Sequence, residues 1–261
     1  MTEQPVFIEH LTACIKRSLQ HLRQQQPFFQ LEQRVVQMPA PLPLAQLMQQ
    51  PARCLLPEIC LANQNQLHAH AFEAQLAACQ TSPCLALWIE SCFHGGSPAL
   101  LRQARQHQRE TYLIAQDWIV DEYQILQARL ADADAVVFSP ALLGSRRTQA
   151  YCQKARFWQL EPVLLIHHPR DLSLARELQL QCVCLSAAPG QTALWQAQRL
   201  EQYTALLQGF SLAFFRSDQA ADLQLAQQHK LRPWLAGDLL WRAADAPEQI
   251  AALQQSLASS P

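Results

Sequence analysis

The chain has 261 residues, 49% of them apolar, with a formal net charge of −1 and a pI near 6.7. That length and apolar content suit a domain with a sizeable core, and the near-zero charge gives no electrostatic basis for binding nucleic acid or a membrane surface. No apolar run approaches the ~20 residues needed to span a bilayer, and charges interrupt the N-terminus where a signal peptide would be apolar. We therefore expect a cytoplasmic protein with neither nucleic acid nor membrane among its partners.

The first 50 residues differ in pattern from the rest of the chain. Apolar spacing predicts a helix over Pro5–Gln24, and Leu and Phe residues interleaved in the Gln-rich segment 20–33 favour an ordered helix end there. Residues 38–52 contain so many prolines that we expect them to be largely irregular. We therefore predict an N-terminal helical extension over 1–50 and one further domain over 51–261.

In the second region, short apolar runs alternate with longer helical patterns, which is typical of repeated βα units around a parallel sheet. Ser97, Asp121 and Asp218 stand where helix N-caps are expected. Eight continuous apolar runs fit strands buried on both faces and closed into a barrel of ~250 residues. The fold class predicted is α/β, a single (β/α)8 TIM barrel. The expected strands are Cys54–Cys60, Cys84–Ile89, Thr111–Gln116, Ala135–Ser139, Val163–His167, Cys182–Ser186, Phe210–Phe215 and Trp234–Gly237.

The nine cysteines are odd in number and scattered, and no Cys-x2-Cys pair is present. This pattern favours reduced, mostly buried thiols over disulfides or a zinc site. Cys182 and Cys184 alternate on one strand and should face the same side. His167 and His168 are adjacent on a strand, so they face opposite sides and do not favour a shared metal ion. We expect neither a metal nor a cofactor.

Residues 93–137 carry the most specific motif of the chain. The segment Phe93–Ser97 reads FHGGS, residues 115–125 read AQDWIVDEYQI, and residues 127–136 read QARLADADAV. This run resembles the indole-3-glycerol-phosphate synthase family, barrel enzymes of tryptophan biosynthesis with a helical extension packed over the barrel mouth. The scaffold positions of the family pattern that this chain keeps are Gly96, Ser97, Asp117, Tyr123, Gln124, Ala128, Arg129 and Asp134.

The same resemblance implies that groups needed for the family chemistry are missing. Gln116 stands where the family has the lysine that acts as general acid in ring closure, and a glutamine cannot deliver a proton. Cys60 replaces a second lysine that assists proton transfer, and Leu165 replaces the glutamate that serves as general base. No catalytic residue is therefore assigned with assurance, although Glu58 keeps the identity of a family glutamate.

Other residues at strand ends are candidates for binding a substrate or ligand. By the family pattern Phe93 and His94 stand at the ring-flanking positions, and Arg216 and Gly237 stand near the phosphate turns. With only six glycines and three lysines in the chain, a phosphate site of the family type is weakly supported. The complete candidate set is Glu58, Phe93, His94, Asp117, Trp118, Ser186, Arg216 and Gly237.

Three functional hypotheses remain at this point. The first is a divergent, catalytically inactive barrel that binds a small molecule in its mouth or a protein partner. The second is an enzyme of altered chemistry, in which Glu58, His94, Asp117 and His167 form an acid–base set and Cys60 is a nucleophile. The third is an active synthase, a carboxy-lyase, that works with an unorthodox set of residues.

Overall fold

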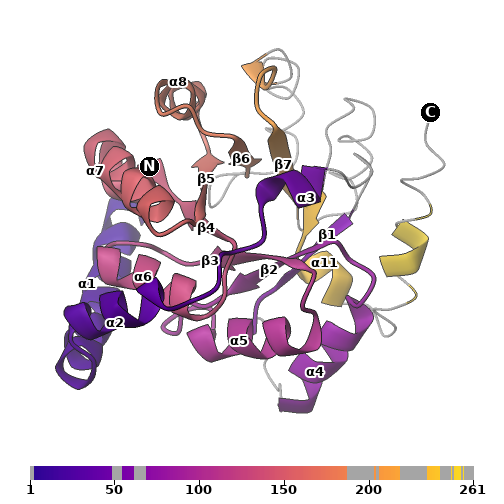
Figure 1. Ribbon diagram of the computed structural model, residues 1–261. Helices are drawn as coiled ribbons and strands as arrows, with labels where there is room; N and C mark the ends of the chain where they lie inside the picture. Colours follow the sequence, from indigo (N-terminus) through magenta and orange to yellow (C-terminus); the bar gives the residue numbers. More distant parts are fainter. Residues whose placement is uncertain are drawn as a thin grey trace.

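Eight parallel strands close into a barrel in the computed structural model of the chain, with β8 pairing to β1 (Figure 1). The structure describes residues 3–48, 55–61, 69–186, 206–217 and 234–241, together with residues 203, 248, 250–253 and 255. The predicted (β/α)8 barrel is confirmed. The strands are β1 (Leu55–Ile59), β2 (Cys84–Trp88), β3 (Tyr112–Gln116), β4 (Ala135–Phe138), β5 (Glu161–Ile166), β6 (Cys182–Leu185), β7 (Leu212–Ser217) and β8 (Trp234–Ala236).

Helices surround the strands on the outside of the barrel (Figure 1). Asp121 caps one of them as expected, because its side chain accepts from the Tyr123 N–H while Gln124 completes a capping box. Ser97 occupies a second predicted N-cap without a side-chain hydrogen bond, and the third, Asp218, lies outside the described residues. The helices are α1 (Glu3–Gln25), α2 (Phe28–Val36), α3 (Leu44–Met48), α4 (Ala69–Ala78), α5 (Pro98–His107), α6 (Glu122–Leu130), α7 (Pro140–Phe157), α8 (Pro169–Glu177) and α11 (Asp238–Trp241).

The strand bounds differ from the prediction by one or two residues. The largest shifts are in β5, which begins at Glu161, and in β7, which ends at Ser217. Glu161 pairs with Ala135 and Ser217 pairs with Ala236. Polar residues at strand ends are part of the ladder but do not belong to the apolar run that marks the strand in the sequence.

Alternate strand residues divide the core into an interior and an exterior layer. The interior cluster includes Leu56, Ile114, Phe214 and both Cys182 and Cys184, which confirms that the two thiols share a face. The exterior layer packs the other strand faces against the helices. The cysteines that the structure describes are all free thiols. Cys54 lies outside the described residues.

The N-terminal segment forms two helices on one flank of the barrel, beside α6 (Figure 1). Leu11, Ile15 and Leu31 of α1 and α2 bury their side chains against Tyr123 and Leu126 of α6. α1 agrees with the predicted helix. The Gln-rich segment, in contrast, contains the end of α1 and the start of a second helix at Phe28, because Leu31 and Val35 find a buried surface.

The proline-rich segment was expected to be largely irregular, and this is only partly correct. Residues 38–43 are irregular, but α3 begins at Leu44. Leu47 is 3% exposed and packs into the interior cluster with Tyr112 at the amino-terminal end of the strands. The short run LAQLM contains no proline and gains burial at the open end of the barrel, which explains the helix. α3 therefore closes the barrel at the amino-terminal ends of its strands.

None of the helices within the described residues is both long and apolar enough to cross a membrane.

Candidate active site at the carboxyl ends of the strands

Glu58 lies at the centre of a polar network near the carboxyl end of β1 and is 1% exposed. Its Oε1 accepts hydrogen bonds from Trp88 Nε1 and Arg216 Nη2, each at 2.7 Å. Its Oε2 accepts from Gln116 Nε2 at 2.9 Å and from Arg216 Nε at 2.7 Å. Four strands, β1, β2, β3 and β7, thus meet at one carboxylate, and each of its oxygens is engaged twice.

The charge of Glu58 is held inside the protein by its partners. Burial opposes ionisation of Glu58. The positive charge of Arg216 and the hydrogen bonds from Arg216, Trp88 and Gln116 outweigh burial and hold the pKa of Glu58 below its ordinary value. The carboxylate therefore stays ionised at neutral pH and cannot donate a proton. From outside, Trp241 of α11 donates its indole N–H to the Glu58 carbonyl at 2.6 Å and fixes the backbone there.

An aromatic group forms the neighbouring wall above β2 and β3. The His94 ring stacks on Trp88 with a centroid separation of 3.7 Å, and Trp118 lies 5.5 Å from the Trp88 ring. Glu90 orients His94, because its Oε2 lies 3.0 Å from His94 Nδ1. Glu90 also accepts backbone N–H bonds from Cys92, Phe93 and His94. Burial raises the pKa of Glu90, but the His94 side chain and the N–H groups of Phe93 and Cys92 outweigh it and hold that pKa below its ordinary value.

Gly96 allows this loop to fold back onto the end of β2. Its N–H donates to the Glu90 carbonyl at 2.8 Å. A Cβ atom at this position would lie 2.2 Å from the Trp88 carbonyl oxygen, a separation that no side chain can adopt. The second glycine of the Gly-Gly-Ser motif is thus explained by close backbone approach beside the Trp88–His94 stack.

Asp117 faces away from the Glu58 network, because it follows Gln116 at the end of the strand. Its Oδ2 accepts from Gln124 Nε2 at 2.9 Å, while its buried Oδ1 has no hydrogen-bond partner among the described residues. Burial, together with the nearby Glu90 charge, raises the pKa of Asp117 to about 7. The carboxyl lines a cavity of about 240 Å³ under α1, next to Ser18 and Cys92.

The remaining predicted candidates are spread around the barrel mouth. Phe93 packs edge-on to His10 of α1, with ring centroids 6.4 Å apart, and so contacts the helical extension. His167 lies buried with Nδ1 3.1 Å from the Ser186 carbonyl oxygen, and burial lowers its pKa. Gly237 is buried and its carbonyl accepts from the Leu240 N–H at the start of α11.

The structure also shows the surroundings of the three residues that replace the family's catalytic side chains. Gln116 is a hydrogen-bond donor to Glu58, and Leu165 packs against the interior cluster beside Cys184 of β6. Cys60 is 6% exposed, with its Sγ 3.9 Å from the His94 carbonyl oxygen. The structure therefore brings Glu58, Gln116 and Arg216 together, but it does not bring Asp117 into contact with them.

Two residues of the site were missed by sequence reasoning. Trp88 belongs to an apolar strand and reads as core, yet its indole N–H donates to Glu58. Glu90 follows β2 directly, and its position after a buried strand is the signal that could have marked it as a site residue. Within the described ranges, no group of three or more His, Cys, Asp or Glu side chains could hold a metal ion.

A closed barrel with charged and polar side chains gathered at the carboxyl ends of its strands belongs to the class of TIM-barrel proteins, whose functional sites lie at that end. The model of one family, described as indole-3-glycerol phosphate synthase, matches residues 8–187. Because this match covers more than half of the chain, the chain belongs to the indole-3-glycerol phosphate synthase family. The matched region ends after β6, so Arg216 and Gly237 lie beyond it.

Individual relatives show the same family at modest identity. The indole-3-glycerol phosphate synthase of Neisseria meningitidis serogroup B is 26% identical over 198 residues, which cover 71% of this chain and 69% of the relative. Indole-3-glycerol phosphate synthase 2 of Streptomyces coelicolor is 37% identical over 83 residues, 32% of each chain. The synthase of Bacteroides thetaiotaomicron is 35% identical over 88 residues, 34% of each chain. The match thus spans about one third of the length of the latter two relatives.

Proposed function

We propose that this chain is a divergent member of its family that does not catalyse the family's ring closure and acts by binding instead. The observation that carries the proposal is the state of Glu58. Its two oxygens receive four hydrogen bonds from Trp88, Gln116 and Arg216, and two of these come from one guanidinium. A carboxylate paired in this way is a structural element, and its acceptor positions are already filled.

Proton transfer is the step for which the two family positions, Gln116 and Leu165, lack the required groups. An amide at position 116 can donate a hydrogen bond but not a proton, and losing a general acid or base typically costs ~10²–10⁴ in rate. Leu165, at the position of the family's general base, is an apolar side chain in the barrel interior. Acid and base are therefore replaced together, and the pocket they would serve is more apolar.

The lysines of the chain do not compensate within the described residues. Lys16 is exposed on α1, and Lys154 of α7 forms an ion pair with Glu122 of α6. Lys230 lies outside the described residues. The binding role that we propose is for a small-molecule ligand in the barrel mouth or for a protein partner.

The test is turnover of carboxyphenylamino-deoxyribulose phosphate by the purified chain, with formation of the indole ring of indole-3-glycerol phosphate followed by fluorescence. The Neisseria meningitidis synthase, assayed in parallel, is the positive control. We expect no indole formation proportional to the concentration of folded protein. Proportional formation at a rate within tenfold of the control would overturn the proposal and support an active synthase.

A second candidate, altered acid–base chemistry, is favoured by one observation. The Glu90 carboxylate orients His94 on the face of Trp88, as a carboxylate orients the imidazole in many acid–base pairs. If Cys60 were the nucleophile of such a site, it would react with iodoacetamide faster than Cys14, the half-buried thiol of α1. The labelling of each thiol is measured by peptide mass spectrometry. If Cys60 is labelled more slowly than Cys14, the binding proposal is favoured over altered chemistry.

A further inference from the structure

The cysteines that the structure describes fall into two groups. Six of these eight thiols are buried, whereas Cys14 on α1 and Cys92 in the loop after β2 are partly exposed. Oxidation of a thiol requires access to the oxidant, so these two are the described cysteines that a small dissolved oxidant can reach. They belong to segments far apart in the sequence, the N-terminal extension and the wall of the barrel mouth.

One face of α1 lies against this loop. His10, Cys14 and Ser18 are four residues apart, so their side chains form one row along the helix, with ~6 Å of rise between neighbours. At one end of the row, His10 packs edge-on against the Phe93 ring, with centroids 6.4 Å apart. At the other end, Ser18 Oγ lies 3.6 Å from Cys92 Sγ. Cys14 lies between these two contacts and therefore faces the same two loop residues.

The Cys14 thiol is close enough to act on Cys92 in the reduced protein. Burial raises the pKa of the Cys92 thiol to about 11, and the neighbouring Cys14 thiol and the Glu90 charge act in the same direction, while Ser18 opposes them. Cys92 therefore stays protonated at neutral pH. It is suited to react second, with a sulfur already activated at Cys14, rather than to attack an oxidant first.

The contact between α1 and the loop also has room for a small movement. Ser18 and Cys92 both line the cavity of about 240 Å³ between α1 and the barrel. A disulfide requires the two Cβ atoms to lie ~3.5–4.5 Å apart, so the loop and the helix must match this spacing. Space beside the Cys92 side chain allows an adjustment that a close-packed contact would resist.

We propose that Cys14 and Cys92 form a reversible disulfide in the presence of an oxidising low-molecular-weight disulfide such as oxidised glutathione, and that this bond ties the N-terminal extension to the loop that carries His94. In the first step, Cys14 loses its proton to solvent and attacks one sulfur of the small disulfide. A mixed disulfide forms, and the other half leaves as a thiolate that takes up a proton. In the second step, Cys92 loses its proton and attacks the Cys14 sulfur, which releases the second small thiol. The protein loses two electrons, and the small disulfide gains them.

The bond acts on the barrel mouth through Glu90. The Cys92 N–H donates to Glu90 Oε1, and Glu90 Oε2 orients His94. Fixing Cys92 to α1 therefore restrains the loop that carries the His94 ring. The bond also closes a loop of roughly 80 residues in the unfolded chain, a length for which cross-linking is strongly stabilising. In a reducing compartment such a bond is transient and reports the redox state. The inference does not depend on what the barrel mouth binds.

The experiment equilibrates the full, initially reduced chain with mixtures of oxidised and reduced glutathione. Free thiols are then alkylated, and the products are mapped by peptide mass spectrometry. We expect a linked Cys14–Cys92 peptide that disappears on treatment with dithiothreitol, and a Tm ~5–15 °C higher for the linked chain than for the reduced chain. Glutathione held on Cys14 without a bond to Cys92, or disulfide-linked dimers on non-reducing electrophoresis, would overturn the proposal.

Variants test whether the described face of α1 brings the thiols together. Cys14→Ser and Cys92→Ser should each abolish the linked peptide and the rise in Tm. Cys14→Ser/Ser18→Cys moves the thiol one turn along the same row, next to the Cys92 sulfur, and should still form the bond. The matched control is Cys14→Ser/Arg17→Cys, which puts the thiol at an exposed position, and we expect at least ~tenfold less bond at the same glutathione ratio. If the Arg17 variant links as readily as the parent, chain mobility rather than this contact joins the thiols, and the assignment is wrong.

Discussion

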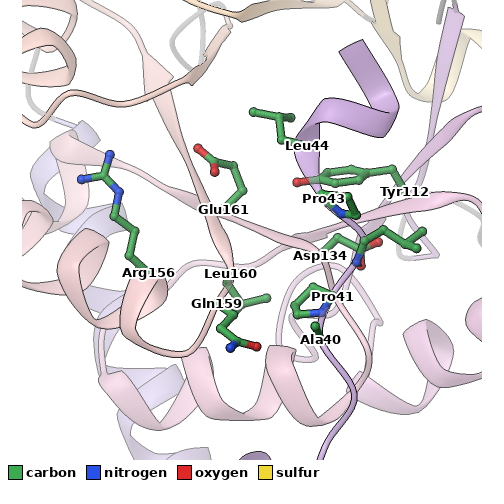
Figure 2. Close-up of a pocket in the computed structure, with 11 residues that line it drawn as sticks. Ala40, Pro41, Pro43, Leu44, Tyr112, Asp134, Arg156, Gln159, Leu160 and Glu161 are labelled. Atoms are coloured by element: carbon green, nitrogen blue, oxygen red, sulfur yellow. The ribbon is translucent and has the colours of Figure 1, made fainter. Parts of the chain in front are cut away.

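The two ends of the barrel bury similar kinds of side chain but treat them differently. At the carboxyl ends of the strands, Glu58 is 1% exposed and receives four hydrogen bonds, including both arms of Arg216. At the amino ends, α3 plugs the barrel, yet the Tyr112 hydroxyl and Glu161 Oε1 have no partner within the part of the chain that is described. The Glu58 network is thus saturated with hydrogen bonds, whereas these two buried atoms at the amino ends have none from the described residues (Figure 2).

This difference shows why polarity alone does not locate a site. In TIM barrels the carboxyl ends of the strands usually hold the chemistry, and the opposite face usually serves stability. In this chain the Glu58 network at the first end is saturated, while Asp117 Oδ1 close to it and the Tyr112 hydroxyl at the second end are buried without a partner among the described residues. What a buried group is bonded to therefore says more about its role than the end of the barrel on which it lies.

The largest effect is expected from removing the cation of the engaged network. Arg216→Met leaves the Glu58 charge buried with two neutral donors, and breaking a buried pair in this way typically costs about 3–5 kcal/mol. We expect a loss of that size in the free energy of unfolding, measured by urea denaturation at pH 7. The double variant Glu58→Gln/Arg216→Met should recover a large part of it, because no uncompensated charge remains.

A surface pair provides the matched control for this experiment. Arg23 on α1 lies 2.5 Å from Asp121, and both side chains are partly exposed, at 43% and 27%. Exposed pairs typically contribute under about 1 kcal/mol, so Arg23→Met should cost far less than Arg216→Met. Equal losses in the two variants would mean that Glu58 is hydrated or can be protonated when Arg216 is removed. The Glu58 network would then not be closed to water.

Asp117 tests whether a second buried carboxyl at the carboxyl ends of the strands is stabilised as Glu58 is. Its pKa is raised from 3.8 to about 7, so the folded state holds the proton more tightly than the unfolded state does. Asp117 therefore does not reduce the stability of the fold below about pH 4, and its destabilising effect grows as the pH rises from about 4 to 7. Since each pKa unit corresponds to about 1.4 kcal/mol, Asp117→Asn should become more stable relative to the parent by up to roughly 4 kcal/mol over that interval.

The measurement is urea denaturation of the parent and Asp117→Asn at pH 4.5 and 7.5. Comparing the two proteins removes the contributions of Glu58 and Glu90, whose lowered pKa values make stability fall as the solution becomes acidic. Glu110→Gln, an exposed carboxyl, should show no such pH-dependent difference. A constant difference between parent and Asp117→Asn at both pH values would mean that Asp117 titrates normally.

The sequence predicted the barrel because eight apolar runs and their spacing are local properties. It also placed Glu58 and Gln116 at strand ends through a motif at fixed spacing. It did not predict that Arg216 binds Glu58, because the two are separated by 158 positions and the partner depends on how the barrel closes. Trp88 was read as core because an indole N–H is invisible in an apolar pattern.

The α3 plug shows the same limit at the other end. Proline content made residues 38–52 read as irregular, and only the open end of the barrel gives Leu47 a place to be buried. The two unpartnered atoms near it belong to Tyr112 and Glu161, which lie far apart in the sequence, and neither residue is recognisable as special from the sequence. Contacts between distant segments, rather than local pattern, decide which polar atoms are left without partners.

A smaller effect is expected from the backbone contact that supports the aromatic wall. Gly96→Ala would place a methyl group 2.2 Å from the Trp88 carbonyl oxygen, so the loop that carries His94 must shift. We expect a loss of about 1–3 kcal/mol in urea denaturation, the usual range for overpacking. Ser97→Ala is the adjacent control, because that N-cap makes no side-chain hydrogen bond and its loss should be small. If Gly96→Ala were as mild as Ser97→Ala, the loop would not be fixed against β2.

The smallest effect compares two buried tyrosines, one from each kind of environment. The Tyr123 hydroxyl donates to the Gln26 carbonyl at 2.9 Å, whereas the Tyr112 hydroxyl has no partner among the described residues. Tyr123→Phe should cost about 1 kcal/mol, while Tyr112→Phe should be neutral or slightly stabilising because it removes an unsatisfied polar atom. Urea denaturation of both variants at pH 7 measures the contrast. If Tyr112→Phe were as costly as Tyr123→Phe, the Tyr112 hydroxyl would have a hydrogen-bond partner, and the contrast with the Tyr123 hydroxyl would be lost.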